Sequence, residues 1–124
     1  MNITIKVGPV KLKAILHDTP TAKKIGEILP LTSRFNTWGD EIYFAIPVEA
    51  ELDDSAQEEV AIGDLGYWPA GNAFCIFFGP TPMSREGRII PASAVNVVGK
   101  VTDDATQLTS IAGESLIEII PAPD

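Results

Sequence analysis

The stretch GDLGYWPAGNAFCIFFGPTP, residues 63–82, decides the fold that we expect for this chain. It holds five of the nine aromatic residues, so most of it should be core. Two strand-like runs, residues 65–68 and 73–78, flank a turn at 69–72 that contains Pro, Gly and Asn. The second run ends at Gly79-Pro80, because proline cannot donate to a sheet ladder. We therefore predict an aromatic hairpin, either inside a barrel or along the wall of a binding groove.

The neighbouring segments extend this β pattern. Both alternating faces of residues 73–78 are apolar, which suits a central strand buried on two sides, as in a barrel with a helix packed outside. Residues 2–7 and 10–16 alternate at period 2 and predict a second hairpin. Thr19 then suits a helix N-cap, Pro20 suits the first helical position, and Pro30 ends the helix.

The rest of the chain predicts short strands punctuated by Gly and Pro. In the strand at 41–46, Ile42 and Phe44 share one face, and Glu41 and Tyr43 share the other. The count is about eight strands with one or two short helices, which indicates a mainly β barrel or sandwich. The remaining expected elements are strands at 31–38, 89–90, 96–101 and 116–120, a loop at 49–59 with one helical turn at 55–59, and a short helix at 103–110.

Length, composition and charge bound the function. We expect one domain, residues 1–124, because 124 residues with 45% hydrophobic content can bury a core of ordinary size. Residues 35–84 hold nine acidic residues and no Lys or Arg, so the basic footprint of a nucleic-acid partner is missing. No apolar run approaches the ~20 residues of a membrane helix. The alternating N-terminus predicts no signal peptide, and the single Cys75 forms no internal disulfide, so we expect a cytoplasmic protein.

Three motifs carry a resemblance to a known family. They are Trp-Gly-x-Glu-Ile-Tyr-Phe at 38–44, the stretch at 63–82, and Pro-x-Ser-x-Val-Asn-Val-Val-Gly-Lys at 91–100. Together with the opening hairpin and the His-Asp-Thr-Pro-Thr-Ala helix start, they make the chain resemble the small cyclophilin-like family of bacterial and archaeal proteins over nearly its whole length. The resemblance implies a closed, cyclophilin-type β-barrel of about eight strands with helices at its ends, and it brings no established activity.

The better-known proteins of this fold are peptidyl-prolyl isomerases. In those isomerases, an Arg on a barrel strand hydrogen-bonds near the proline amide, and a Phe-x-x-Gln-Gly-Gly-type segment lines the pocket beside it. The resemblance would imply the same two features here. This chain lacks that segment, and Gln57 and Gln107 stand in unrelated contexts. Arg34 is the only Arg on a predicted strand in the first two-thirds of the chain, and no glycine pair or glutamine follows it. We therefore expect no isomerase activity of the usual kind.

Residues with strong intrinsic chemistry are scarce. His17, the only histidine, adjoins Asp18 at a strand–helix junction, where neighbouring side chains face opposite ways. Cys75 lies in an apolar strand with no base beside it. One His and one Cys cannot make a standard zinc set, and the acidic residues at 53–59 match no calcium loop. We assign no catalytic residue, no metal site and no cofactor, and whether the chain is an enzyme stays open.

Aromatic and polar residues together predict a binding site. Trp38 and Tyr43 are the best candidates for a pocket wall, because Tyr43 faces away from the expected core together with Glu41. The planar guanidinium of Arg34 suits a peptide carbonyl or a ligand carboxylate. The predicted ligand-binding residues are Arg34, Asn36, Trp38, Glu41, Tyr43, Tyr67, Phe77 and Thr81.

Three functional hypotheses follow from these residues. The first is a cyclophilin-like barrel that binds a small molecule or an extended peptide in a concave groove, without isomerase activity. The second is a peptidyl-prolyl cis-trans isomerase in which Arg34 faces the groove. The third is a subunit module that contributes one wall of a composite enzyme site, which predicts an exposed apolar patch. The oligomeric state stays open, with a homodimer among the options.

Overall fold

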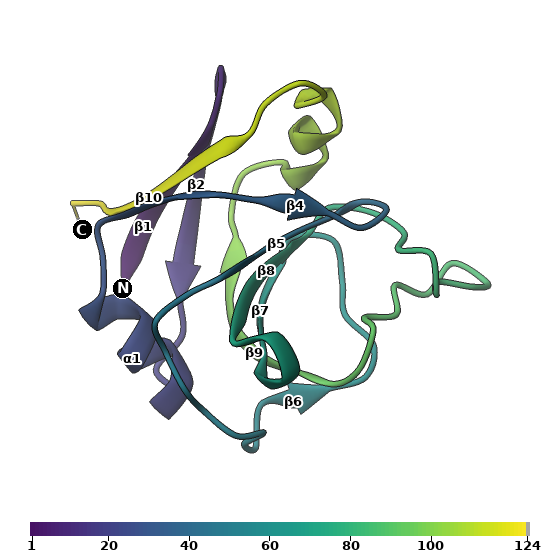
Figure 1. The fold of residues 1–124 in the computed structure, drawn as a ribbon, viewed down its shortest axis with the longest axis horizontal. Helices are drawn as coiled ribbons and strands as arrows, with labels where there is room; N and C mark the ends of the chain where they lie inside the picture. The colour runs from purple at the N-terminus through teal and green to yellow at the C-terminus, as the bar shows by residue number, and fades with distance from the viewer. Residues whose placement is uncertain (124) are drawn as a thin grey trace.

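One antiparallel sheet organises the computed structural model, which describes residues 1–123 (Figure 1). A short α-helix and two 3₁₀ helices accompany the ten strands of this part of the chain. In chain order the elements are β1 (Asn2–Val7), β2 (Val10–Leu16), α1 (Pro20–Glu27), β3 (Leu31–Arg34), β4 (Asn36–Thr37), β5 (Glu41–Ala45), β6 (Ala56–Gln57), β7 (Asp64–Trp68), η1 (Pro69–Gly71), β8 (Ala73–Phe77), β9 (Val95–Val101), η2 (Ala105–Ser110) and β10 (Leu116–Pro121). The prediction of a mainly β fold with short helices is confirmed.

The sheet does not close by hydrogen bonds. Its strand order is β3-β10-β1-β2-β9-β7-β8-β5-β4, with β6 paired to β9, and the ladder ends at β3 and β4. A closed barrel is therefore not confirmed among the described residues. The two edge strands are consecutive in the chain, with only Phe35 between them. The polypeptide itself thus connects the two edges that the hydrogen-bonded ladder leaves open.

The N-terminal predictions are confirmed in detail. β1 and β2 form the expected hairpin, with Val7 opposite Val10 at its turn. The Thr19 side chain accepts a hydrogen bond from the Ala22 N–H at 3.2 Å, and Pro20 opens α1. This cap satisfies one of the N–H groups that a helix start leaves unpaired. The helix ends before Pro30, as expected, because Ile28 already serves as its C-cap.

The prediction of a helical turn at 55–59 is wrong. The Asp53 carboxylate accepts hydrogen bonds from both the backbone N–H and the hydroxyl of Ser55, at 2.8 and 2.5 Å, which fixes a turn. The chain leaves this turn extended as β6, and Ala56 pairs with Asn96 of β9. A local side-chain hydrogen bond and a sheet partner distant in sequence have replaced the helical turn.

β8 is buried on both faces, as its sequence predicts. Phe74 and Ile76 belong to the main core, where the Phe44 and Phe74 rings pack with centroids 5.7 Å apart. Cys75 and Phe77 point to the other face and form a second, smaller apolar cluster. No helix of residues 1–123 contributes to that second cluster, contrary to the expected outer helix, and Val60, Ile89 and Val95 complete it. Among the described residues no helix has the length and apolar character needed to cross a membrane.

Candidate functional site

The pairing of β5 with β8 determines which side chains meet on the second face of the sheet. Glu41 lies opposite Phe77, and Tyr43 lies opposite Cys75. Because side chains alternate along a strand, these four residues point to the same side, while Ile42 points to the main core. The alternation predicted for residues 41–46 therefore carries Glu41 and Tyr43 out of the main core.

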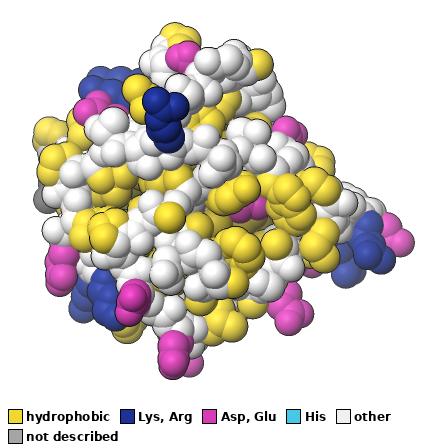
Figure 2. Space-filling view, in the orientation of Figure 1, with side chains coloured by type: hydrophobic (Ala, Val, Ile, Leu, Met, Phe, Trp, Pro, Cys, Tyr) yellow, Lys and Arg dark blue, Asp and Glu magenta, His cyan; other side chains and the backbone are white. Residues whose placement is uncertain are grey.

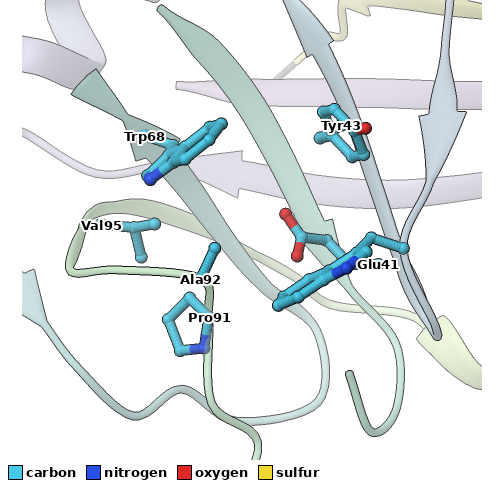
Figure 3. A pocket seen from close by; sticks show the side chains of 7 residues that line it. Glu41, Tyr43, Trp68, Pro91, Ala92 and Val95 are labelled. Carbon is cyan, nitrogen blue, oxygen red and sulfur yellow. The ribbon is translucent and has the colours of Figure 1, made fainter. Parts of the chain in front are cut away.

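A pocket of about 230 Å³ opens on this face (Figure 3). Figure 2 shows hydrophobic side chains gathered on the right of the visible surface, around a hollow where acidic atoms are exposed. The volume lies below the range of about 300–1,000 Å³ that is usual for drug-sized ligands, so the pocket suits a small molecule or a single side chain. The residues that line it are Trp38, Glu41, Tyr43, Trp68, Pro91, Ala92 and Val95.

Two contacts fix the Trp68 wall of the pocket. The indole N–H of Trp68 donates a hydrogen bond to the Ser93 hydroxyl at 2.6 Å. On its other side the ring lies against the η1 turn, where a Cβ at Gly71 would come within 2.8 Å of ring carbons. Gly71 therefore leaves the space that the indole occupies. The turn between β7 and β8 thus shapes the pocket as well as reversing the chain.

Hydrogen bonds within residues 79–94 position the opposite wall. The Thr81 hydroxyl donates to the Ile90 carbonyl, and the Ser84 hydroxyl accepts from the backbone N–H groups of Thr81 and Ile90 at 2.9 and 3.1 Å. At the start of this segment, the Asp40 N–H donates to the Pro80 carbonyl at 2.8 Å. These bonds hold the chain just before Pro91 and tie it to the turn that precedes Glu41.

Glu41 is the one carboxyl group among the lining residues. Its side chain points into the space between the other labelled residues, and only 6% of the residue is exposed (Figure 3). Burial raises the pKa of this carboxyl from 4.5 to about 7, and a hydrogen bond with the Cys75 thiol opposes the shift. Its pKa therefore lies near neutrality. No Lys, Arg or His lines the pocket, and none of the ion pairs of residues 1–123 includes Glu41.

Cys75 is not poised as a nucleophile. Burial raises the pKa of its thiol well above the usual value, and the neighbouring Glu41 charge and hydrogen bond raise it further. The thiolate is the nucleophilic form of cysteine, so this environment suppresses it. Cys75 instead serves as a small apolar floor residue that also contacts Glu41.

No cluster of three or more His, Cys, Asp or Glu side chains in residues 1–123 is arranged to hold a metal ion. His17 is exposed at the end of β2, on another part of the molecule's surface from the lining residues. The chemistry available in the pocket is therefore that of one carboxyl group, one phenol and two indoles.

Three of the eight predicted binding residues meet in this pocket: Trp38, Glu41 and Tyr43. Arg34 and Asn36 do not line it, because they are exposed on the edge strands β3 and β4. Their roles in binding stay predictions without support from the pocket geometry.

The other three predicted residues have structural positions. Tyr67 lies in the main core, with its hydroxyl donating to the Val48 carbonyl at 2.6 Å, because the alternation of β7 turns it away from Trp68. Phe77 is fully buried in the cluster beneath the pocket. Thr81 is buried and closes the loop described above.

Four lining residues escaped sequence reasoning: Trp68, Pro91, Ala92 and Val95. A signal for Trp68 was present, since it alternates with Tyr67, and only one of the two can face the core. No pattern in the sequence indicated that the segment containing Pro91 folds back toward Glu41. That approach depends on hydrogen bonds of the intervening loop.

The fold and the pocket describe a mainly β domain with one antiparallel sheet, short helices and an apolar pocket on one face. The chain belongs to the Cyclophilin-like family, whose model matches residues 1–120. Among solved structures, the hypothetical protein AF2241 from Archaeoglobus fulgidus is 35% identical, with a TM-score of 0.81 over 98% of this chain and 95% of that chain.

A second solved structure, that of McbB in complex with tryptophan, shares the fold at 15% identity and a TM-score of 0.68. The match covers 98% of this chain but only 45% of McbB, so the likeness concerns the fold alone. None of the curated proteins compared with the chain matches it.

Proposed function

We propose that the pocket lined by Glu41, Tyr43 and Trp68 binds a small organic molecule, and that the chain does not catalyse proline isomerisation. The observation that carries this proposal is the pocket itself: an apolar hollow of about 230 Å³ that contains both tryptophans of the chain and one buried carboxyl group. Apolar walls with a few polar groups are the usual composition of a small-molecule site.

The absence of an isomerase donor supports the second half of the proposal. Twisting a prolyl amide means overcoming a barrier of about 18–20 kcal/mol, and a cationic donor aimed at the amide weakens its resonance. No Arg lines the pocket, and Arg34 lies exposed on β3. The aromatic walls can hold an apolar group, but nothing beside them offers that donor.

Tryptophan fluorescence tests the binding directly. Because Trp38 and Trp68 are the only tryptophans and both line the pocket, the whole signal reports on this site. We expect a saturable change on titration with 2-phenylethanol, a small neutral aromatic probe. Ala92→Leu adds bulk to a lining position and should abolish the change. Ala112→Leu, an equal change at an exposed position outside the lining, should leave it intact. A signal that fails to saturate would refute the proposal.

A proline-isomerisation assay on a short Xaa-Pro peptide tests the other half. We expect no acceleration by the native chain even at high concentration. Acceleration that disappears in Arg34→Ala would establish the isomerase hypothesis instead and would make Arg34 its key residue.

One observation favours the composite-site hypothesis as a second candidate. McbB contains this fold as 45% of a longer chain, so the fold also occurs as part of a larger protein. The fluorescence titration separates the two candidates, because a module that supplies one wall of a shared site would not bind the probe alone. Saturable binding by the isolated chain therefore favours a self-sufficient pocket.

A further inference from the structure

We propose that the pocket selects a small amine cation, held by the Glu41 carboxylate and surrounded by the rings of Trp38, Tyr43 and Trp68. This inference rests on the proposed function, since it names the chemical class of ligand for the same pocket. The ligand that we infer is a free organic amine with an apolar body.

The first support is a missing partner for a buried charge. Glu41 is 6% exposed, points into the pocket, and forms no ion pair with a Lys, Arg or His of residues 1–123. Within the part of the chain that the structure describes, the side chain that hydrogen-bonds to it is the weakly donating Cys75 thiol. A buried carboxylate without a cation is costly, whereas an ammonium group supplies three strong donors and the complementary charge. An amine ligand would therefore supply the cationic hydrogen-bond donor that the Glu41 carboxylate lacks.

The second support is the composition of the walls. Three of the chain's four Trp and Tyr residues line this one pocket, and Tyr67 is the exception. Indole and phenol rings attract a cation placed over their faces within about 6 Å. The net charge of −8 also raises the local concentration of cations around the molecule. The same rings accommodate the apolar body of the ligand.

The size of the pocket favours a free amine over a lysine of a peptide. A volume of about 230 Å³ has room for an ammonium group with a small attached ring or chain. A lysine side chain would bring a thin alkyl stem between three aromatic rings and would leave much of their surface uncovered. The two sources share one chemistry, and the experiment below separates them.

The protonation state of Glu41 gives the proposal a distinctive signature. Because the pKa of this carboxyl is about 7, roughly half of the molecules carry its proton at pH 7. Two other titratable groups face it: Cys75 on β8, whose raised pKa keeps the thiol neutral, and Tyr43 on β5. No other residue that lines the pocket has an ionisable side chain. A simple amine stays cationic near neutrality, so binding should require ionised Glu41.

Three probes with related skeletons test the charge preference in the full chain. We expect 2-phenylethylamine to bind at least about tenfold more tightly than neutral 2-phenylethanol at pH 8, as charge-assisted bonds do. The anion 3-phenylpropanoate should not bind. The affinity for the amine should fall about tenfold from pH 8 to pH 6, in step with the ionised fraction of Glu41. The affinity for the alcohol should stay constant.

A matched pair of variants assigns the effect to Glu41. Glu41→Gln preserves the shape of the side chain and should lose both the amine preference and its pH dependence, while still binding the alcohol. Glu27→Gln, a change of the same kind at an exposed position of α1, should behave like the native chain. Calorimetry on the native chain in two buffers of different ionisation enthalpy needs no variant. It should reveal about half a proton released per amine bound at pH 7.

The outcomes separate the two proposals. Equal binding of amine and alcohol, without pH dependence or proton release, would overturn the amine assignment and leave the proposed binding function standing. Failure of every probe to bind would refute the binding function itself. Tighter binding of N-acetyl-lysine methylamide than of 2-phenylethylamine would identify a peptide lysine as the source and would overturn the free-amine assignment.

Discussion

Two buried polar groups in this molecule have opposite surroundings. Asn96 on β9 is completely buried, and each polar atom of its side chain has a partner. Its Oδ1 accepts a hydrogen bond from the Asp53 N–H at 2.9 Å. Its Nδ2 donates to the Thr21 hydroxyl at 3.1 Å and to the Glu51 carbonyl at 2.9 Å. Glu41 is almost as buried, but it faces an apolar pocket with a thiol as its hydrogen-bonding neighbour.

The same difference appears in the pKa values of Asp53, which belongs to the Asn96 network, and of Glu41. Burial raises the pKa of Asp53, but hydrogen bonds from Ser55 and Thr21 outweigh it, and the pKa ends below 3.8. At Glu41 burial prevails and the pKa rises to about 7. The Asn96 network joins α1, the loop before β6 and β9, so its polar groups serve the fold. Among residues 1–123 Glu41 has the Cys75 thiol as a hydrogen-bonding neighbour but no ion-pair partner, which is why we assign its carboxyl to a ligand.

The largest effect should come from removing the centre of the satisfied network. Asn96→Ala removes the partners of the part-buried Asp53 N–H and Glu51 carbonyl and of the Thr21 hydroxyl, and it opens a small cavity at a fully buried position. We expect a loss of about 3–4 kcal/mol in the free energy of unfolding, since each orphaned group costs about 1–3 kcal/mol. Urea denaturation measures it. Asn36→Ala, on the exposed edge strand β4, is the matched control and should change stability by less than about 0.5 kcal/mol. A loss below about 1 kcal/mol for Asn96→Ala would contradict the importance of the network.

The next effect should have the opposite sign and should depend on pH. The pKa of Glu41 is about 7 in the folded chain and 4.5 for the free side chain, so the folded state holds its proton more tightly. The contribution of Glu41 to stability is therefore most favourable below pH 4.5 and falls as the pH rises toward and through 7. The gap between the two pKa values corresponds to about 3 kcal/mol at pH 8.

Glu41→Gln removes this penalty, because an amide cannot ionise. We expect the variant to be more stable than the native chain by up to about 3 kcal/mol at pH 8, and by less than about 1 kcal/mol at pH 5. Denaturation curves at the two pH values give the difference. Glu27→Gln should show no such gain at either pH. If Glu41→Gln were less stable than the native chain at pH 8, the carboxylate would have a partner within the protein.

Alternation, helix capping and apolar runs predicted those elements that are determined by residues close together in the sequence. The hairpin of β1 and β2 followed from alternation, the start of α1 from Thr19 and Pro20, and the doubly buried β8 from its apolar run. The same rules failed at residues 55–59, because the Asp53 side chain and strand β9 determine the structure there. Closure of the sheet into a barrel is not confirmed, because the hydrogen-bonded ladder of the described residues ends at β3 and β4.

The site was predicted only in part, for the same reason. Glu41 and Tyr43 were found because alternation along one strand separates them from Ile42. The residues that face them across the pocket, Pro91 and Ala92, come from a segment that is distant in the sequence and forms no strand or helix. Arg34 was predicted as a binding residue by analogy with the Arg of proline isomerases, but it does not line the pocket. The sequence therefore predicts the pocket residues that share strand β5, but not the residues of the opposite wall, such as Pro91 and Ala92.

The smallest of the three effects sharpens the comparison between the acids. Because the pKa of Asp53 is lowered in the folded chain, its contribution is complete above pH 3.8 and is lost as the pH falls through and below that value. Asp53→Asn should therefore cost about 1–2 kcal/mol at pH 7, since an amide replaces a charged acceptor of the Thr21 hydroxyl, and less at pH 3. The exposed neighbour Asp54 supplies the control Asp54→Asn, which should stay within about 0.5 kcal/mol.

Denaturation of Asp53→Asn at pH 7 and pH 3 also tests whether the hydrogen-bond partners of an acid decide if its neutralisation destabilises or stabilises the chain. Neutralising a satisfied acid should destabilise the chain where the acid is ionised, and neutralising an unsatisfied one should stabilise it there. An equal loss at both pH values would mean that Asp53 acts through shape and packing alone. A gain in stability for Asp53→Asn at pH 7 would mean that burial outweighs its hydrogen bonds. The contrast with Glu41 would then no longer distinguish a structural acid from a ligand-binding one.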